Sequence, residues 1–330
     1  MTKRATYLLL IAITVLLGGC GEYQQIQKSK DPDLKYQAAL QYFNNKQYTR
    51  AQTLLDDVTI YYKGTERSED IVCYLARCYM GNKDYTTSAE YYEAYVRNYP
   101  KGKYIIEARY QVGNCYYMDA PDPRLDQEIT KKAIKWFTEF VELFGDSPYA
   151  EQAYTQLDEL YDRLAQKEYY NAKLYYDLGT YPGNASTNGG SNYEACVVTA
   201  QNALKDYPYA SASLREDLSI LVLRAKYYLA RQSVTERQME RYRDAIDEYY
   251  AFQNDFPESQ YMKEAKNILN SSERIVSKKG GLQDNDDEQK ENKGRTISEE
   301  EKETRKRRDS QKDSKRDLKK IKESSVLNNS

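Results

Sequence analysis

Residues 36–63, YQAALQYFNNKQYTRAQTLLDDVTIYYK, decide the fold, because their pattern returns 37 residues later in residues 73–100, CYLARCYMGNKDYTTSAEYYEAYVRNYP. In both stretches a small residue is followed by Tyr, a polar turn and a second Tyr, and then by small and large apolar residues at helical spacing. The matched positions are Ala39, Tyr42, Lys46, Tyr48, Ala51, Leu55, Val58 and Tyr62 in the first stretch and Ala76, Tyr79, Lys83, Tyr85, Ser88, Tyr92, Tyr95 and Tyr99 in the second. The sequence therefore contains an internal repeat of two short helices.

This order of residues resembles the tetratricopeptide repeat, whose unit of roughly 34 residues folds as two antiparallel helices. The resemblance implies that small residues such as Ala39 and Ala51 let the two helices of a hairpin approach closely. A single hairpin cannot bury its apolar face, so the repeats must stack on one another. We therefore expect an all-α superhelix of tetratricopeptide-like hairpins.

Composition argues against several classes of activity. The chain has 330 residues, 35 of them Tyr, no His, and a formal net charge of -2. Without His there can be no His general base, no Ser-His-Asp or Cys-His nucleophile and no His metal site. The balanced charge gives no general case for binding nucleic acid. We expect a protein that is not an enzyme and that carries no cofactor.

The first residues have the pattern of an export signal. Two basic residues precede an apolar run of 11 residues, Tyr7 to Leu17, which is too short to span a bilayer and has the length of a signal-peptide core. Leu17-Gly18-Gly19-Cys20 resembles the lipobox of bacterial lipoproteins. That resemblance implies a signal peptide over residues 1–19 and acylation of Cys20, for example by palmitate; the alternative is an ordinary secretory signal with an incidental Cys. Gly21 in place of Asp favours the outer membrane, with a periplasm-facing domain.

The remainder of the chain divides by pattern into three parts. Residues 20–32 are polar and predict a tether, and residues 33–279 predict a solenoid of about five hairpins plus a capping helix from Ser259 to Ser277. Extra residues at 119–126 fall in the turn of the third hairpin, and a loop rich in Gly and Asn occupies residues 182–190. The long helical pattern from Ser147 to Gly179 can form one helix or two.

Residues 280–330 form a charged tail without aromatic side chains. Such a segment cannot bury enough apolar surface to offset the entropy of ordering it, so we expect disorder. A second interpretation is that the basic cluster Arg305-Lys306-Arg307-Arg308 contacts anionic lipid, an acidic partner or the cell wall.

Two local runs strengthen a family resemblance. Residues 164–176, LAQKEYYNAKLYY, and residues 204–208, LKDYP, together with the lipobox and the repeats, resemble the BamD family. The resemblance implies a non-catalytic scaffold lipoprotein of the machinery that assembles outer-membrane β-barrels. It also implies three partners: a BamA-like barrel protein with periplasmic domains, sister lipoproteins, and unfolded outer-membrane proteins.

Repeats of this type present a groove built from the first helix of each hairpin, and aromatic side chains there suit an extended peptide. The inward positions predicted from the repeat are Tyr36, Leu40, Phe43, Asn44, Arg77, Met80, Glu107, Tyr110, Asn114 and Tyr117. The alternative is that Tyr36 and Tyr110 pack against neighbouring repeats.

The four remaining cysteines predict buried free thiols. Cys78 and Cys115 occupy the same small position of consecutive repeats, and Cys196 occupies the small position of a second helix. Cys73 and Cys78 are five residues apart on one helix, a spacing at which side chains do not meet. Neighbouring helix axes are typically 8 to 10 Å apart, too far for a disulfide unless the side chains point at each other. The paired spacing of a metal site is missing.

The sequence leaves one other function open and argues against a second. A glycan- or nutrient-binding outer-membrane lipoprotein can be built on the same repeats. A peptidoglycan-acting enzyme would need a separate catalytic lobe, for which residues 20–277 leave no room.

Overall fold

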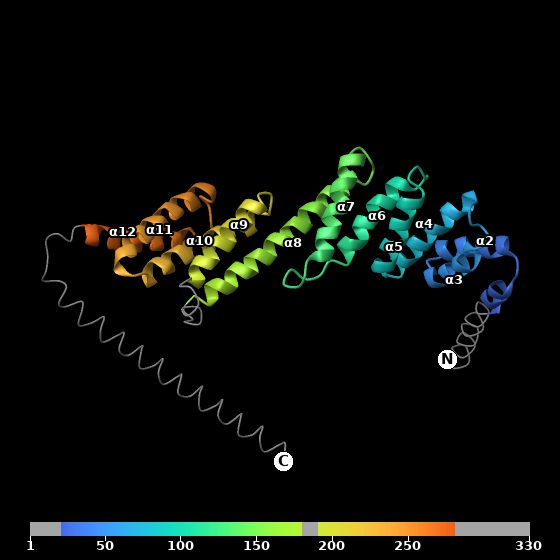
Figure 1. Ribbon diagram of the computed structural model, residues 1–330, viewed down its shortest axis with the longest axis horizontal. Helices are drawn as coiled ribbons and strands as arrows, with labels where there is room; N and C mark the ends of the chain where they lie inside the picture. The colour runs from blue at the N-terminus through green and yellow to red at the C-terminus, as the bar shows by residue number, and fades with distance from the viewer. Residues whose placement is uncertain (1–20, 180–190, 281–330) are drawn as a thin grey trace, which may run out of the picture.

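The computed structural model describes residues 21–179 and 191–280, and there every regular element is a helix. Figure 1 shows antiparallel hairpins that follow one another along an elongated molecule, from α2 near one end to α12 near the other. The expected signal peptide, Cys20, residues 182–190 and the tail from residue 281 lie outside the described residues.

The helices form the expected five hairpins and a cap. Their order is α2 (Pro32–Asn44), α3 (Tyr48–Thr59), α4 (Glu66–Gly81), α5 (Tyr85–Asn98), α6 (Ile105–Met118), α7 (Glu128–Phe144), α8 (Ala150–Asp177), α9 (Asn192–Asp206), α10 (Ala212–Gln232), α11 (Thr235–Asp255) and α12 (Met262–Gly280). Each helix packs on the next in the chain, from α2 through to α12. The prediction of an all-α repeat fold is confirmed.

Local signals in the sequence fix where helices begin. Asp31 caps α2 by accepting hydrogen bonds from the backbone amides of Asp33 and Leu34, and Asp84 caps α5 in the same way through Thr87. The small repeat positions are buried where helices meet. At Gly113 a Cβ atom would lie 2.7 Å from the ring of Phe137, so the third hairpin needs glycine there.

The pattern that allowed one helix or two after Ser147 is a single helix, α8, of 28 residues. It packs against α7 and α9 and also against α6 and α10. The insertion expected in the third hairpin lies between α6 and α7, and α8 holds it in place. Arg163 donates to the carbonyl oxygens of Ala120 and Pro121, and Lys167 donates to that of Leu125.

The segment expected to be a tether is different in the structure, because residues 21–28 are helical. Tyr23 and Ile26, three residues apart, pack on the core of the first hairpin. The Tyr23 ring lies edge-on to Tyr42 at a centroid distance of 5.5 Å, and the Arg50 guanidinium lies 5.2 Å from the Tyr23 centroid. These two apolar side chains on one helical face give the segment a packed surface that its polar composition conceals.

Candidate functional site

The surface formed by the first helix of successive hairpins is the candidate binding site, and we call it the first-helix face. It comprises α2, α4, α6 and the start of α8, which carry or contact the residues of the expected groove. On this face charged and aromatic side chains link each first helix to the next.

One link joins α4 to α6 through Arg77 and Glu107. Arg77 donates two hydrogen bonds to the two carboxylate oxygens of Glu107, at 2.7 and 2.5 Å. Its guanidinium lies 4.8 Å from the ring centroid of Tyr104 and 5.1 Å from that of Tyr74. Burial acts to lower the pKa of Arg77, but the Glu107 carboxylate more than offsets this, and the pKa lies above its usual value. Arg77 is therefore a charged, fixed part of the face.

A second pair of groups completes the same link. Asp70 on α4 accepts a hydrogen bond from the Tyr104 hydroxyl at 2.9 Å and pairs with Lys103 at 2.5 Å. We call Asp70, Arg77, Tyr104 and Glu107 the N-terminal clamp. It holds α4 and α6 in a fixed register, which in turn fixes the spacing of side chains along the first-helix face.

The link from α6 to α8 uses amide and hydroxyl groups. Gln156 accepts from the Tyr110 hydroxyl at 3.1 Å and donates to the side-chain oxygen of Asn114 at 2.9 Å. Further along, the Tyr117 hydroxyl donates to Glu159, and this bond and burial raise the pKa of Tyr117. Asn114 and Tyr117 are therefore half-buried, with their polar groups already engaged.

Burial separates the ten residues of the expected groove into three sets. Tyr36 and Tyr110 are buried, with 6% and 2% of their surface exposed, so their rings pack against neighbouring helices and offer no contact surface. Asn44 is exposed. The half-buried residues that line the surface are Leu40, Phe43, Arg77, Met80, Glu107, Asn114 and Tyr117.

Sequence reasoning missed Tyr74, which lies between two of these residues. Its ring is edge-on to Phe43 at a centroid distance of 5.0 Å and lies beneath Arg77. It also missed Tyr104 and Asp70 of the N-terminal clamp. The signal was available, since an Asp and an Arg seven residues apart, followed by Tyr and Glu three residues apart, recur later in the chain.

That recurrence joins α10 to α12, where Asp217, Arg224, Tyr261 and Glu264 form what we call the C-terminal clamp. Tyr261 donates to Asp217 at 2.7 Å, and Arg224 donates to both oxygens of Glu264 at 2.7 and 2.6 Å. The Arg224 guanidinium lies 5.1 Å from the Tyr261 centroid. The two clamps have the same geometry at two places in the solenoid.

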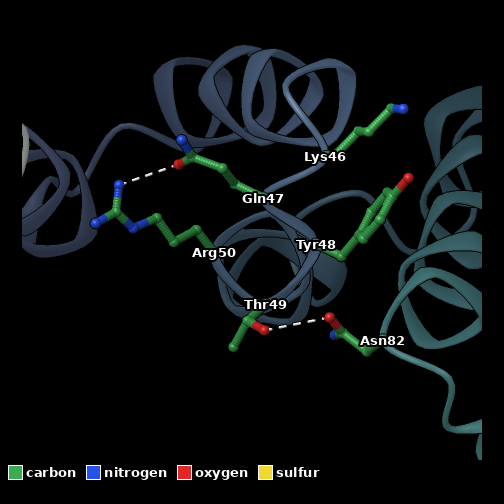
Figure 2. A pocket seen from close by; sticks show the side chains of 6 residues that line it. All are labelled: Lys46, Gln47, Tyr48, Thr49, Arg50 and Asn82. Carbon is green, nitrogen blue, oxygen red and sulfur yellow. Dashed lines mark hydrogen bonds between the residues drawn. The ribbon is translucent and has the colours of Figure 1, made fainter.

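A hollow of about 330 Å³ lies beside the turn between α2 and α3 (Figure 2). It is lined by Lys46, Gln47, Tyr48, Thr49, Arg50 and Asn82. Gln47 accepts from Arg50 at 3.0 Å, and Thr49 donates to Asn82 at 3.3 Å, which ties the first hairpin to the turn of the second. In Figure 2 the side chains of Lys46 and Arg50 point away from each other.

The four cysteines are free and buried, as expected. Burial raises the pKa of the Cys73, Cys78, Cys115 and Cys196 thiols to about 12. Among the described residues no group of acidic, Cys or His side chains could hold a metal ion. None of the described helices is long and apolar enough to cross a membrane.

Fold and face together define a helical-hairpin solenoid whose first helices α4, α6 and α8 are linked by side-chain hydrogen bonds. A family model described as an outer membrane lipoprotein, YfiO, matches residues 28–225 of the 330. Since this span exceeds half of the sequence, the chain belongs to that family of outer membrane lipoproteins.

Two individual proteins are also similar. One, from Aquifex aeolicus (strain VF5), carries the provisional name outer membrane protein assembly factor BamD. It is 25% identical over 186 residues, and the match spans 55% of this chain and 60% of that protein. Among solved structures, a human IFIT1 dimer with PPP-AAAA is 14% identical, over 73% of this chain and 56% of that one, with a TM-score of 0.24. At that score the overlap carries no argument about this chain.

Proposed function

We propose that this chain is a non-catalytic scaffold lipoprotein of the outer-membrane β-barrel assembly machinery. It is held on the periplasmic side of the outer membrane by acylated Cys20. It binds the periplasmic domains of a BamA-like barrel protein and sister lipoproteins, and it receives unfolded barrel proteins. Membership of the outer membrane lipoprotein family and the similarity to a protein named as an assembly factor support this proposal.

The observation that carries the substrate part of the proposal is the half-buried row of Phe43, Tyr74 and Met80 beside Arg77. Aromatic and thioether side chains provide adaptable contact area for the alternating aromatic residues of a barrel strand. Arg77 is held by Glu107 and presents a fixed polar group next to that row. Tyr36 and Tyr110 support the site from within the core and do not touch the peptide.

A pull-down in mild detergent tests the partners. The full acylated protein is captured from its own envelope, and the proteins that accompany it are identified by mass spectrometry. We expect a large barrel protein that carries periplasmic repeats. Recovery of a nutrient transporter in its place would contradict the scaffold proposal and favour the glycan- or nutrient-binding alternative.

A peptide-binding measurement tests the first-helix face. The double variant Tyr74→Ala, Met80→Ala is expected to weaken binding of an unfolded barrel-strand peptide about tenfold, the typical effect of removing an anchor of a recognition surface. Fluorescence anisotropy measures the affinity. The matched control is Ile60→Ala, an exposed apolar residue in the connection between α3 and α4, which should leave binding unchanged. Equal affinities in the double variant and the wild type would exclude this site.

A further inference from the structure

The helix over residues 21–28 fixes the position of the chain directly after Cys20. Tyr23 contacts Tyr42, near the end of α2, and Arg50, near the start of α3. The chain then runs back to Asp31, which caps the opposite end of α2. Helix 21–28 is therefore antiparallel to α2, and its first residues lie beside the turn between α2 and α3.

This arrangement limits how far that turn can be from residue 20. Three extended residues span at most about 11 Å, which bounds the separation of the Cys20 and Tyr23 backbones. Attractions between exposed charges and a charged surface act over a similar distance, a Debye length of about 8 to 10 Å at ordinary salt concentrations. A surface that receives the acyl chains of Cys20 would therefore lie on the side of the solenoid that carries this turn.

The edge of the solenoid at this turn carries exposed basic side chains. Lys46 lies in the turn of the first hairpin, Lys83 lies in the turn of the second, and both are exposed. The bond from Thr49 to Asn82 brings the two turns together. Glu22 and Asp84 are acidic neighbours, and Asp84 is engaged as the cap of α5.

The backbone at both lysines adopts an uncommon conformation. Lys46 and Lys83 have φ of 58° and 63°, in the left-handed region where Gly or Asn costs less. Each Lys follows the C-cap residue of the first helix of its hairpin, Asn45 or Asn82, so the two lysines occupy equivalent positions of successive turns.

We propose that the edge formed by Lys46 and Lys83 faces the membrane and contacts anionic phospholipid headgroups. Helix 21–28, latched by Tyr23 and Ile26, sets this orientation, so the solenoid does not pivot freely on its lipid. The inference rests on the proposed function in one respect, the acylation of Cys20.

Site-specific fluorescence in vesicles tests the orientation. The full lipoprotein carries a single added cysteine as Lys46→Cys, Lys83→Cys or the control Lys63→Cys, an exposed position in the connection at the far end of α3. Each is labelled with a fluorescent maleimide and reconstituted into phosphatidylethanolamine and phosphatidylglycerol vesicles that contain a headgroup spin label. The four native thiols are buried, so they give little background labelling.

We expect loss of fluorescence at positions 46 and 83 and none at position 63. Equal quenching at all three positions, or none at any while the protein floats with the vesicles, would overturn the orientation; the latter outcome would point to an acidic protein partner. If the unlabelled protein does not float with vesicles, the lipid anchor is wrong and the orientation falls with it. Flotation thus tests the lipid anchor, and quenching tests the orientation.

A second variant tests the latch. Tyr23→Ala together with Ile26→Ala should keep flotation but bring quenching at position 46 down to the level at position 63. The matched control Gln25→Ala changes an exposed residue of the same helix and should leave the quenching pattern intact. Unchanged quenching in the Tyr23→Ala, Ile26→Ala variant would show that the helix does not set the orientation.

Discussion

The N-terminal and C-terminal clamps solve the same packing problem with different surroundings. Each contains an Arg that donates two hydrogen bonds to a Glu carboxylate and lies over a Tyr ring whose hydroxyl donates to Asp. The N-terminal clamp joins the first helices α4 and α6, and the C-terminal clamp joins the first helix α10 to the cap α12. In the N-terminal clamp the Arg77 and Glu107 side chains are 22% and 19% exposed. In the C-terminal clamp Arg224 and Glu264 are 26% and 45% exposed. The two clamps therefore share their geometry, but the Arg and Glu side chains of the N-terminal clamp are more shielded from water.

The neighbours of the clamps differ in the same direction. The N-terminal clamp adds Lys103, which pairs with Asp70, and Tyr74, whose ring lies under Arg77. The equivalent positions near the C-terminal clamp hold Gln260 and Leu221. Two copies of the same motif therefore need not contribute equally to the free energy of unfolding. Its contribution depends on how much water the neighbouring residues exclude.

Removal of each Arg is expected to give the largest difference. Arg77→Ala leaves Glu107 without its partner in a largely desolvated place and should lower the free energy of unfolding by ~2–3 kcal/mol. Arg224→Ala leaves Glu264 partly in water, so its cost should be ~1 kcal/mol. Urea denaturation followed by circular dichroism measures both. Equal losses of unfolding free energy in the two variants would mean that the exposure of the Glu side chain does not determine what each clamp contributes to stability.

Tyrosine titration sharpens the comparison further. The pKa of Tyr104 and of Tyr261 is raised to about 12 from an ordinary 10.0. Burial is the main cause for Tyr104, followed by the bond to Asp70, whereas the bond to Asp217 is the main cause for Tyr261, followed by burial. Asp217→Asn should therefore return the pKa of Tyr261 toward 10 more fully than Asp70→Asn does for Tyr104. NMR of ring-labelled tyrosine measures both values.

The same shifts contribute to the loss of stability at alkaline pH. A raised tyrosine pKa means that folding favours the neutral phenol. This stabilisation is complete below the unfolded pKa near 10 and is lost as the pH rises through about 12, so unfolding should become easier over that window. Identical pKa changes in the two Asp→Asn variants would contradict the assignment of different causes.

The smallest expected effect concerns Lys103, the additional positive charge of the N-terminal clamp. Lys103→Ala should cost ~0.5 kcal/mol, since this side chain is 54% exposed and Asp70 keeps its bond from Tyr104. High salt should shrink the loss, which identifies it as electrostatic. The reciprocal change Gln260→Lys places a cation at the equivalent position of the C-terminal clamp and should give a gain of similar size. Thermal melts at low and high salt measure both, and a loss that salt leaves unchanged would point to packing.

Much of the fold follows from residues that recur at a fixed spacing. Ala39, Ala76 and Gly113 predict the close helix contacts, and the structure buries all three. The family resemblance, the solenoid and the free thiols were also predictable, because each depends on local patterns or on burial at equivalent positions.

The site was harder to predict because it depends on contacts between repeats. Tyr110 occupies an inward repeat position, yet Phe137, Phe140 and Tyr149 surround its ring and remove it from the surface. Helix 21–28 was missed because two apolar residues in a polar stretch predict little until a partner surface is known. The clamps were missed because their residue pattern recurs only when the second and third hairpins are compared with the fifth hairpin and the cap.

Helix α8 has a mechanical consequence. As one helix of 28 residues it is about 42 Å long, and it packs against α6 and α10, each of which belongs to one clamp. A continuous helix resists bending far better than a jointed pair, so α8 acts as a strut between two braced ends. Two partners that bind opposite ends of the solenoid would therefore be held at a fixed distance from each other.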